Sequence, residues 1–295
     1  MKSERRNPGP SWGYAFLQSA ARWMPAPLFR ACLRAGAVAG WACMPRAREY
    51  ERRYWEALLG RPPTLREQWA HFGDFAETLA AKLALAQGVR PRFHFHDSES
   101  SRDFAAICRE PGAALFGSFH VGEADLMGAM LAEFGRTVHM VRLRVGNSRD
   151  IRTLEQSLAG SLRFIWVNQP DEMLFALKNA LEAGHGVAMH CDRPAFGARK
   201  EAFSFLGRRR WFPFTIYHLS ALFQAPVGFA FALRRDGTGS IPVVTAPVFH
   251  PDPGREATIT KAKAHFQEVL YLLETHLRHD PGIWFNFEPL NEPVS

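Results

Sequence analysis

The residues best suited to chemistry are a histidine and an aspartate five positions apart, His120 and Asp125. They follow an apolar run, Ala113 to Phe119, and stand where a helical pattern begins. A histidine in such a turn is exposed at the end of a strand, where its imidazole can take a proton from a substrate. A nearby carboxylate can bind the other ring nitrogen, fix the tautomer and stabilise the imidazolium. The spacing therefore predicts His120 as a general base oriented by Asp125, while a purely structural histidine would fit the same pattern.

The other reactive side chains give weaker signals. No G-x-S-x-G nucleophile elbow occurs, and the sequence indicates no partner for Cys191 beyond the adjacent His190, so Cys191 is expected to be a small buried residue. The four cysteines include no C-x-x-C pair, and His94 and His96 have no third and fourth metal ligand in view. We therefore expect neither a metal site nor a bound cofactor.

Apolar runs alternate with helical patterns on both sides of His120. A capping box, Thr64-Leu-Arg-Glu67, begins a long amphipathic helix that ends near Gly88. The predicted strands are Arg92 to His96, Ala113 to Phe119, Thr137 to Leu143, Leu162 to Val167, Gly186 to His190, Val227 to Leu233 and Ile241 to Phe249. The predicted helices between and after them cover 101–109, 121–134, 149–159, 170–183, 214–224 and 256–279. This alternation predicts an α/β fold with a central mixed or parallel sheet flanked by helices, in a domain of residues 64–295.

One apolar run in this domain would pass for a membrane span. Residues 211–233 contain no acidic residue, lysine or arginine. Pro226, however, removes a helical hydrogen bond and clashes with the preceding turn. We therefore expect a helix over 214–224 followed by a buried strand that begins at Val227.

Residues 1–63 are predicted to form a separate basic segment that associates with membranes. Residues 11–44 are rich in alanine and aromatic side chains, but arginines interrupt them and Pro25 and Pro27 break them, so no span of about 20 apolar residues survives. The pattern predicts two short amphipathic helices in a membrane interface, anchored by Trp12, Trp23 and Trp41. Two helices packed on the protein itself would give the same pattern.

The net charge of +7 is concentrated in this segment. Residues 1–66 hold 12 Lys and Arg against 4 Asp and Glu, whereas the remainder holds 24 against 25. Such a basic segment fits anionic lipid or an acidic partner protein, and no helix-turn-helix, zinc-finger or RNP-like pattern indicates nucleic acid. A chain with 47% hydrophobic and 22% charged residues is neither disordered, collagen-like nor a polytopic membrane protein.

An ordered series of motifs covers most of the chain. Along the sequence these are the basic stretch Arg46 to Arg53, the long helix, the H-x4-D of His120, the block Met189-His-Cys-Asp192-Arg193-Pro194, the loop from Phe203 through Gly207 to Pro213, and Gln224-Ala-Pro226-Val227. In order and spacing the series resembles the bacterial lysophospholipid and lipid A biosynthesis acyltransferases of the lauroyl or myristoyl type. The segment Pro281-Gly-Ile-Trp-Phe-Asn-Phe287 looks more like a subgroup found in aryl-polyene gene clusters.

The resemblance implies a role for each matching residue. His120 would be the general base and Asp125 its orienting partner. The second block would contribute substrate-binding Arg142, Arg144 and Asn147, the third block Asp192 and Arg193, and the loop beside the acyl group or an acceptor phosphate Gly207 and Arg208.

The implied fold is glycerolipid acyltransferase-like, and the implied protein is a membrane-associated O-acyltransferase. It would move a fatty acyl chain from acyl carrier protein, or coenzyme A, to a hydroxyl of a lipid acceptor of the lipid A precursor type, in lipopolysaccharide biosynthesis. It would work on the cytoplasmic face of the cell inner membrane as a peripheral or monotopic protein. An apolar tunnel would hold the acyl chain, lined by some of Phe116, Leu126, Met127, Met130 and Phe134. The alternatives are an aryl-polyene or other glycerolipid acceptor, a thioesterase-like hydrolase, and a non-catalytic lipid-binding protein on the same fold.

Overall fold

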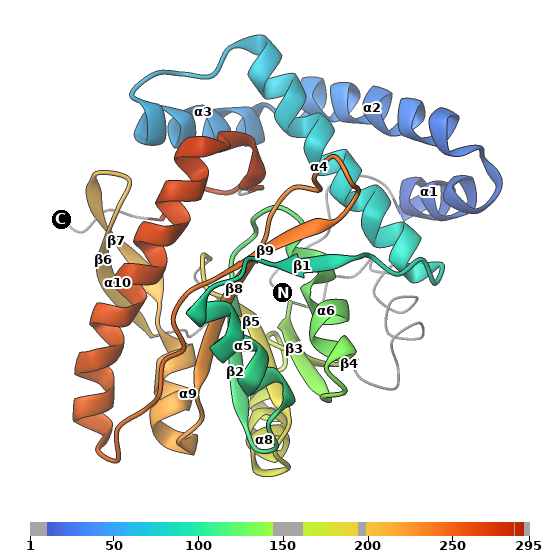
Figure 1. The fold of residues 1–295 in the computed structure, drawn as a ribbon. Coiled ribbons are helices and arrows are strands. Elements are labelled where there is room, and N and C mark those ends of the chain that lie inside the picture. Colours follow the sequence, from blue (N-terminus) through green and yellow to red (C-terminus); the bar gives the residue numbers. More distant parts are fainter. Residues whose placement is uncertain (1–10, 144–161, 194–198, 286, 292–295) are drawn as a thin grey trace.

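A seven-stranded mixed sheet forms the centre of the protein (Figure 1). The computed structural model describes residues 11–143, 162–193, 199–285 and 287–291. The strands lie in the order β1-β9-β8-β2-β5-β3-β4, and every neighbouring pair is parallel except β8 and β9. Their bounds are β1 Phe93–Phe95, β2 Ala114–Ser118, β3 Val138–Arg142, β4 Leu162–Trp166, β5 Gly186–His190, β8 Val227–Ala232 and β9 Ile241–Thr245. The predicted α/β fold with a mixed central sheet is therefore confirmed.

Helices cover both faces of this sheet. They are α4 Leu65–Ala86, α5 Glu99–Arg109, α6 Met127–Glu133, α8 Pro170–Glu182, α9 Thr215–Phe223 and α10 Arg255–His279, with short 3-10 turns η1 Ala124–Leu126 and η2 Pro281–Ile283. Because side chains alternate along a strand, Leu115 packs with α8, α9 and α10, whereas Phe116 packs with α5 and α6. The predicted helix over 149–159 lies outside the described residues.

The structure confirms the predicted capping box at Thr64 and the predicted division of the apolar run 211–233 into a helix and a strand. The capping box forms, since the Thr64 side chain accepts from the Glu67 backbone and the Glu67 side chain accepts from the Thr64 backbone. The apolar run 211–233 divides into the end of β7, helix α9 and the fully buried strand β8. Among the described residues, no helix is both long enough and apolar enough to cross a membrane.

The segment from Phe203 to Pro213 was predicted as a loop, and this was wrong. It forms most of an antiparallel hairpin, β6 Lys200–Phe205 and β7 Arg208–Pro213, that packs along α10 (Figure 1). Leu206 and Gly207 form its two-residue turn with φ of 51° and 72°. Two successive positive φ angles are what a tight hairpin turn requires. The hairpin was missed because its alternating pattern is obscured by three consecutive arginines.

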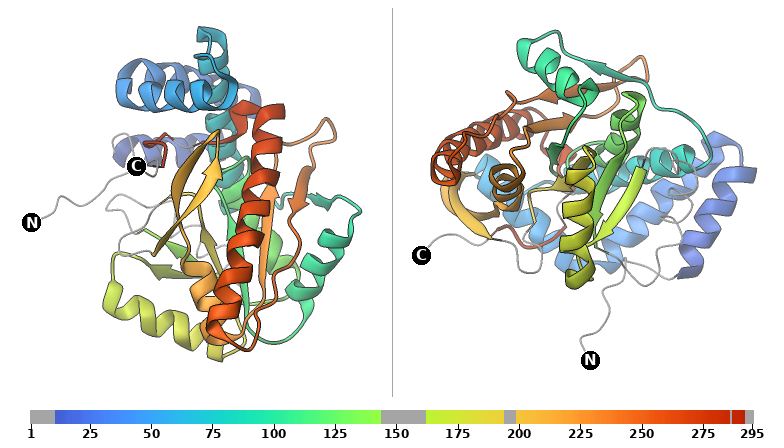
Figure 2. Two further views of the ribbon diagram at one scale, coloured as in Figure 1. Left: turned by 90° about the vertical axis from the view of Figure 1, so that its left-hand side faces the viewer. Right: turned by 90° about the horizontal axis from the view of Figure 1, so that it is seen from below.

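The N-terminal helices lie together beyond one end of the sheet (Figure 2). They are α1 Ser11–Trp23, α2 Ala26–Cys43 and α3 Pro45–Leu59, so the predicted break at the prolines occurs. Buried side chains of α1 and α2 form a small core with α4, and α3 extends the main core with Tyr54 and Trp55. Trp41 is half-buried and contacts α4: its indole N–H donates to Gln68, and its ring packs edge-on against Trp69. The α1–α3 segment is therefore packed on the domain that carries the sheet.

Candidate active site

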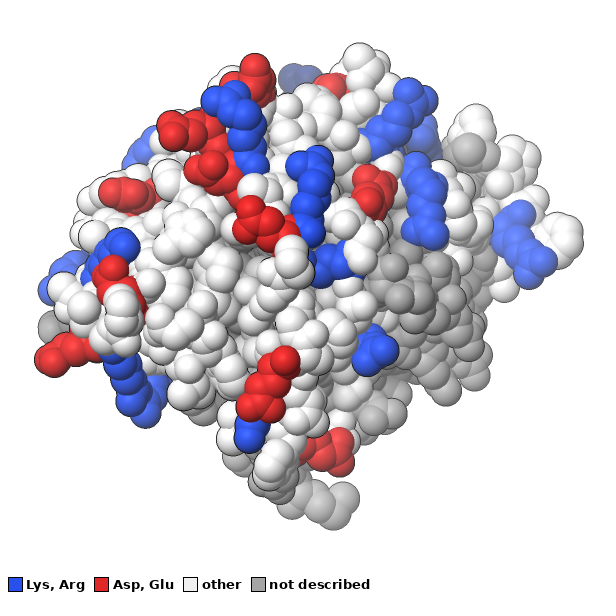
Figure 3. Space-filling model, turned by 60° about the horizontal axis from the view of Figure 1, so that its bottom comes forward, with Lys and Arg blue, Asp and Glu red and all other residues white. Residues whose placement is uncertain are grey.

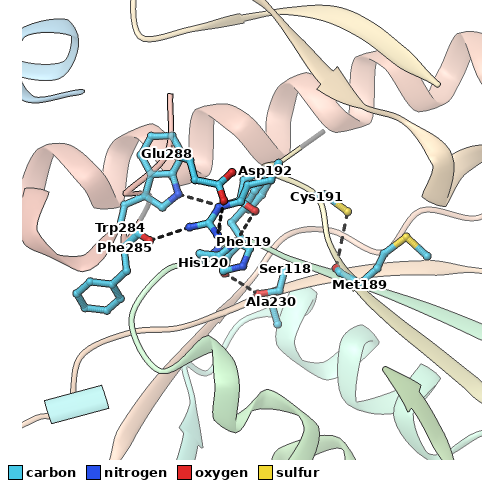
Figure 4. Close-up of polar contacts among 11 residues, drawn as sticks. Ser118, Phe119, His120, Met189, Cys191, Asp192, Ala230, Trp284, Phe285 and Glu288 are labelled. Carbon is cyan, nitrogen blue, oxygen red and sulfur yellow. Dashed lines mark hydrogen bonds and ion pairs between the residues drawn. The ribbon is translucent and has the colours of Figure 1, made fainter. Parts of the chain in front are cut away.

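His120 and Asp192 meet because two neighbouring parallel strands end at the same level. β2 and β5 pair in register, with Ser118 opposite His190. Two residues beyond these strand ends lie His120 and Asp192, whose side chains face each other (Figure 4). His120 Nδ1 lies 2.8 Å from Asp192 Oδ1, and the His120 backbone N–H donates to Asp192 Oδ2 at 3.0 Å. The pair therefore lies outside the carboxyl ends of the parallel strands, the usual ligand site of an open α/β sheet.

The hydrogen bonds of Asp192 determine the tautomer of His120. Asp192 is fully buried, and its Oδ2 also accepts the indole N–H of Trp284 at 3.0 Å. Burial acts to raise the pKa of the Asp192 carboxyl, but the electrostatic effect and hydrogen bond of His120, together with Arg193 and His190, outweigh burial and hold that pKa well below the usual range. An ionised carboxylate only accepts, so Nδ1 of His120 carries the proton and Nε2 can accept one from a substrate. The His120 side chain is 31% exposed, so a substrate can reach it.

Asp125 does not orient His120, which corrects the sequence prediction. Its carboxylate pairs with Arg142 at the end of β3 and lies 3.4 Å from Nζ of Lys82 on α4. The surrounding protein acts to raise the pKa of Asp125, but Lys82 and Arg142 outweigh this and keep the pKa well below its usual range. Asp125 follows His120 through a turn and η1 rather than one regular helix, so its side chain reaches α4 and β3 while Asp192 occupies Nδ1.

The turn after His120 requires glycine. Gly122 has φ of 53°, and a Cβ atom at this position would lie 2.2 Å from the backbone oxygen of Ala232. Its N–H donates to the Ile283 carbonyl at 2.7 Å, and the next N–H, of Glu123, donates to Ala232 at 2.8 Å. The turn that holds His120 is thus fixed between the end of β8 and η2.

A second histidine, His190, stacks on His120. The ring centroids are 4.2 Å apart at an interplanar angle of 28°. Burial, together with the nearby His120, lowers the pKa of His190 to about 3. His190 is therefore neutral at physiological pH and forms an uncharged wall beside the base.

The segment after α10, residues 281–285, crosses the site and is called the strap below. It pairs with the His120 turn, because the Phe285 N–H donates to the His120 carbonyl at 2.9 Å and Trp284 forms an antiparallel bridge with Val121. Arg193 donates to the Phe285 carbonyl at 2.9 Å. The strap thereby connects the residues that follow β2 with those that follow β5.

A small apolar pocket, with a cavity volume of about 20 Å³, lies beside His190. It runs between the ends of β2, β3 and β5 and helix α6, and its lining includes Phe104, Phe116, Met127, Leu131, Met140 and Met189. Of the five residues predicted to hold an acyl chain, Phe116 and Met127 line it. Leu126 and Met130 are buried in the adjacent core, and Phe134 packs against Phe95. This volume is about that needed for one water molecule, so the lining side chains would have to move apart before a longer apolar group could enter.

Neither of the two reactive side chains at the strand ends is poised as a nucleophile. Ser118 donates to the Ala230 carbonyl at 3.0 Å and is 8% exposed. Cys191 is buried, as predicted, and burial raises the pKa of its thiol well above the ordinary value. Within the described residues, no group of three or more His, Cys, Asp or Glu is placed to hold a metal ion. The arrangement would suit a general base that acts without a protein nucleophile.

The structure gives different positions to the residues predicted to bind substrate. Asp192 is bound to His120 and fully buried, so its side chain is not exposed to a substrate. Arg142 and Arg193 lie near the base, paired with Asp125 and with Glu288 and the strap respectively. Gly207 and Arg208 lie at the turn of the β6–β7 hairpin. Arg144 and Asn147 lie outside the described residues.

Sequence reasoning missed the role of two site residues, Trp284 and Lys82. Both come from helical or terminal segments far from His120 in sequence, and neither belongs to a local pattern with the base. The role of Asp192 could have been found, because it follows a buried strand by the same two positions as His120 does. Strand ends that carry polar side chains in this way are a usable signal.

No protein-family model matches this chain, and no curated protein matches it significantly.

Proposed function

We propose that this protein is a membrane-associated O-acyltransferase that moves a fatty acyl chain from acyl carrier protein, or coenzyme A, to a hydroxyl of a lipid acceptor of the lipid A precursor type. The observation that carries the proposal is a tautomerically fixed, accessible histidine base beside an apolar pocket. The motif series that resembles the lipid A acyltransferases agrees with it, and the fold would then be glycerolipid acyltransferase-like.

The proposed reaction requires one base and no protein nucleophile. His120 Nε2 takes the proton of the acceptor hydroxyl, and the resulting oxygen attacks the thioester carbonyl. When the tetrahedral intermediate collapses, the carbon–sulfur bond breaks and the imidazolium returns its proton to the leaving thiolate. Asp192 stabilises the imidazolium between these steps, since Nδ1 donates to a buried carboxylate. Lys82 and Arg142 supply positive charge near the reacting groups, where an oxyanion develops.

The apolar pocket suits the acyl chain. Its lining is almost entirely carbon and sulfur, with the ring of His190 and the Ser118 hydroxyl at the end beside the base. A fatty chain would have to open this pocket by displacing its flexible methionine side chains, and its carbonyl carbon would then lie next to His120. The apolar lining thus favours an acyl donor over a small polar one.

The N-terminal helices provide a surface for a membrane. Seven of the twelve large hydrophobic residues exposed in the described part of the chain lie on α1, α2 and α4, and Trp23 is 80% exposed. Exposed Arg30 and Arg34 lie among them. On α4, the half-exposed Phe75 contacts Phe285 of the strap, so one of these exposed apolar residues lies at the edge of the site. Such a mixture of apolar and arginine side chains is typical of helices that lie in a lipid interface.

The distribution of charge favours binding of an acidic carrier protein near the N-terminal helices. The N-terminal 66 residues hold the entire excess of positive charge. On the face drawn in Figure 3, acidic and basic side chains of the described residues are interspersed. We therefore place the carrier near the basic N-terminal helices, on the cytoplasmic face of the cell inner membrane.

The test is mass spectrometry of total lipids from cells that lack the gene and carry either the wild type, His120→Ala or His139→Ala. His139 is a matched control, because it pairs with His185 on the sheet rather than with a carboxylate. We expect the wild type and His139→Ala to restore one acyl mass on lipid A, and His120→Ala to restore none. If another lipid gained the acyl mass instead, that lipid would replace the lipid A precursor as the proposed acceptor. Release of free fatty acid alone would indicate a hydrolase. A lipid profile that is the same for all strains would overturn the proposal.

A further inference from the structure

A second histidine–carboxylate pair, His71 and Glu51, lies deep between α3 and α4. His71 Nδ1 is 2.8 Å from Glu51 Oε1, and the two side chains are 2% and 0% exposed. His71 Nε2 lies 3.2 Å from the carbonyl oxygen of Trp284 in the strap. Both ring nitrogens of this buried histidine are therefore bound, one to an acid and one to the strap.

The Trp284 carbonyl dictates where the proton on His71 must be. A carbonyl oxygen only accepts, so Nε2 of His71 carries a proton and donates it. At Nδ1, either a protonated Glu51 donates to the ring or an ionised Glu51 accepts from an imidazolium. Burial acts to raise the pKa of Glu51 and outweighs the opposing effect of His71. In both states the acid keeps His71 in the form that donates to the strap.

Trp284 joins this pair to the catalytic pair. Its carbonyl accepts from His71, and its indole N–H donates to Asp192, which binds His120. The ring is 1% exposed and is held edge-on by Tyr54, whose hydroxyl donates to the Pro281 carbonyl. His71 also stacks on Phe285, the residue whose N–H binds the His120 carbonyl. Helices α3 and α4 thus hold the strap at Trp284 and Phe285, which contact Asp192 and His120 respectively.

We propose that Glu51 and His71 are positioning residues for the reaction of His120, acting through Trp284 on the Asp192 carboxylate. This inference rests on the proposed function. It means that α3 and α4 form part of the active site and do more than attach the protein to a membrane.

Two pairs of variants of the full chain separate positioning from packing. His71→Phe keeps a ring against Phe285 but has no donor, whereas His71→Gln restores an amide N–H close to the position of Nε2. Glu51→Ala leaves Nδ1 of His71 without a partner and removes the contact that holds the ring toward the strap, whereas Glu51→Gln can donate to Nδ1. The matched control is His265→Phe, because His265 likewise bridges a side chain, Tyr217, and a carbonyl, that of Pro247, at the α9–α10 interface.

The first readout needs no substrate. In protein labelled with ¹⁵N-tryptophan, Trp284→Phe identifies the indole signal of Trp284. We expect its hydrogen exchange to become at least about tenfold faster in His71→Phe, which removes the buried hydrogen bond to the strap, and measurably faster in Glu51→Ala, which leaves the His71 ring held by that bond alone. Exchange should stay near the wild-type rate in His71→Gln, Glu51→Gln and His265→Phe. An unchanged rate in His71→Phe and Glu51→Ala would overturn the inference.

The second readout is acyl transfer from a long-chain acyl-CoA or acyl carrier protein to a purified lipid acceptor. We expect kcat to fall about tenfold or more in His71→Phe and Glu51→Ala with KM changed less than about twofold, because substrate binding is untouched. His71→Gln should recover most of the loss. Full activity in His71→Phe would refute the positioning role alone. Transfer by neither the wild type nor any variant would instead refute the proposed function, and the exchange rates would still decide whether His71 holds the strap.

Discussion

The His120–Asp192 and His71–Glu51 pairs share a distance of 2.8 Å between ring Nδ1 and a carboxylate oxygen, but they differ at the other ring nitrogen. Nε2 of His71 is bound to the strap inside the protein. The His120 side chain is 31% exposed beside an apolar pocket, and within the described residues its Nε2 has no hydrogen bond. In the proposed function, the same pair of residue types therefore acts on a substrate in one place and holds backbone in the other. Access to Nε2 decides which, and sequence spacing does not.

The largest expected effect distinguishes the two aspartates near His120. Asp192→Asn should lower kcat by about 10³- to 10⁴-fold, since an amide at this position favours the wrong histidine tautomer. Asp125→Asn should lower it only about tenfold, equivalent to about 1.4 kcal/mol, because Asp125 binds Lys82 and Arg142 rather than the base. Steady-state transfer rates with folded variants measure both. A larger loss in Asp125→Asn than in Asp192→Asn would return the orienting role to Asp125.

The next effect concerns stability, and it should run in the opposite order to catalysis. His71→Ala leaves a buried carboxyl and a buried carbonyl without partners and should lower the free energy of unfolding by about 3 kcal/mol. His120→Ala removes a partly exposed ring and should cost about 1 kcal/mol or less. Urea unfolding of both variants against the wild type gives the two values. Equal losses of unfolding free energy in the two variants would mean that the buried His71–Glu51 pair does not stabilise the fold more than the partly exposed His120–Asp192 pair.

The two carboxylates should also give opposite pH dependence of stability. The folded-state pKa of Asp192 is depressed, so its contribution is present above the unfolded pKa of about 3.9 and is lost as pH falls through the folded value. The folded-state pKa of Glu51 is raised, so its ionisation destabilises the fold as pH rises above about 4.3. Measured by urea unfolding between about pH 3 and pH 7, Asp192→Asn should remove part of the loss at low pH. In Glu51→Gln, the free energy of unfolding should fall less as pH rises than in the wild type. The difference should be about 1.4 kcal/mol for each unit by which the folded-state pKa of Glu51 is raised. Parallel curves for the two variants would contradict this assignment.

Local patterns predicted the elements of this fold because the apolar and capping residues along each element reflect which parts of it are buried and where it begins. β5 was predicted with its observed bounds from a run of buried residues, and α4 began at its capping box. The hairpin β6–β7 was missed because the consecutive arginines Arg208 to Arg210 obscure the alternation of apolar and polar residues in β7. Arg210 is nevertheless buried, and it donates to backbone carbonyls.

The site was harder to predict than the fold, because its partners are chosen by strand order. His120 was found from one turn, but Asp192 is 72 residues away and meets it only because β5 lies beside β2. Asp125 is close in sequence and was preferred for that reason. Trp284 and His71 come from opposite ends of the chain, and no local pattern joins them to the base.

The smallest effect tests whether the two contributions of the N-terminal helices are separable. Trp23→Ser removes an 80% exposed ring that lies outside the buried core, so it should weaken binding to anionic phospholipid vesicles several-fold, about 1 kcal/mol, with the fold intact. Leu222→Ser is the control, since Leu222 is 71% exposed on α9 and should leave binding unchanged. His71→Phe should reduce kcat without altering vesicle binding, because His71 is buried. Vesicle sedimentation and acyl transfer to a detergent-dispersed acceptor measure the two properties separately. If Trp23→Ser reduced transfer to that dispersed acceptor as much as His71→Phe does, the helices would act on the site through membrane binding rather than through the strap.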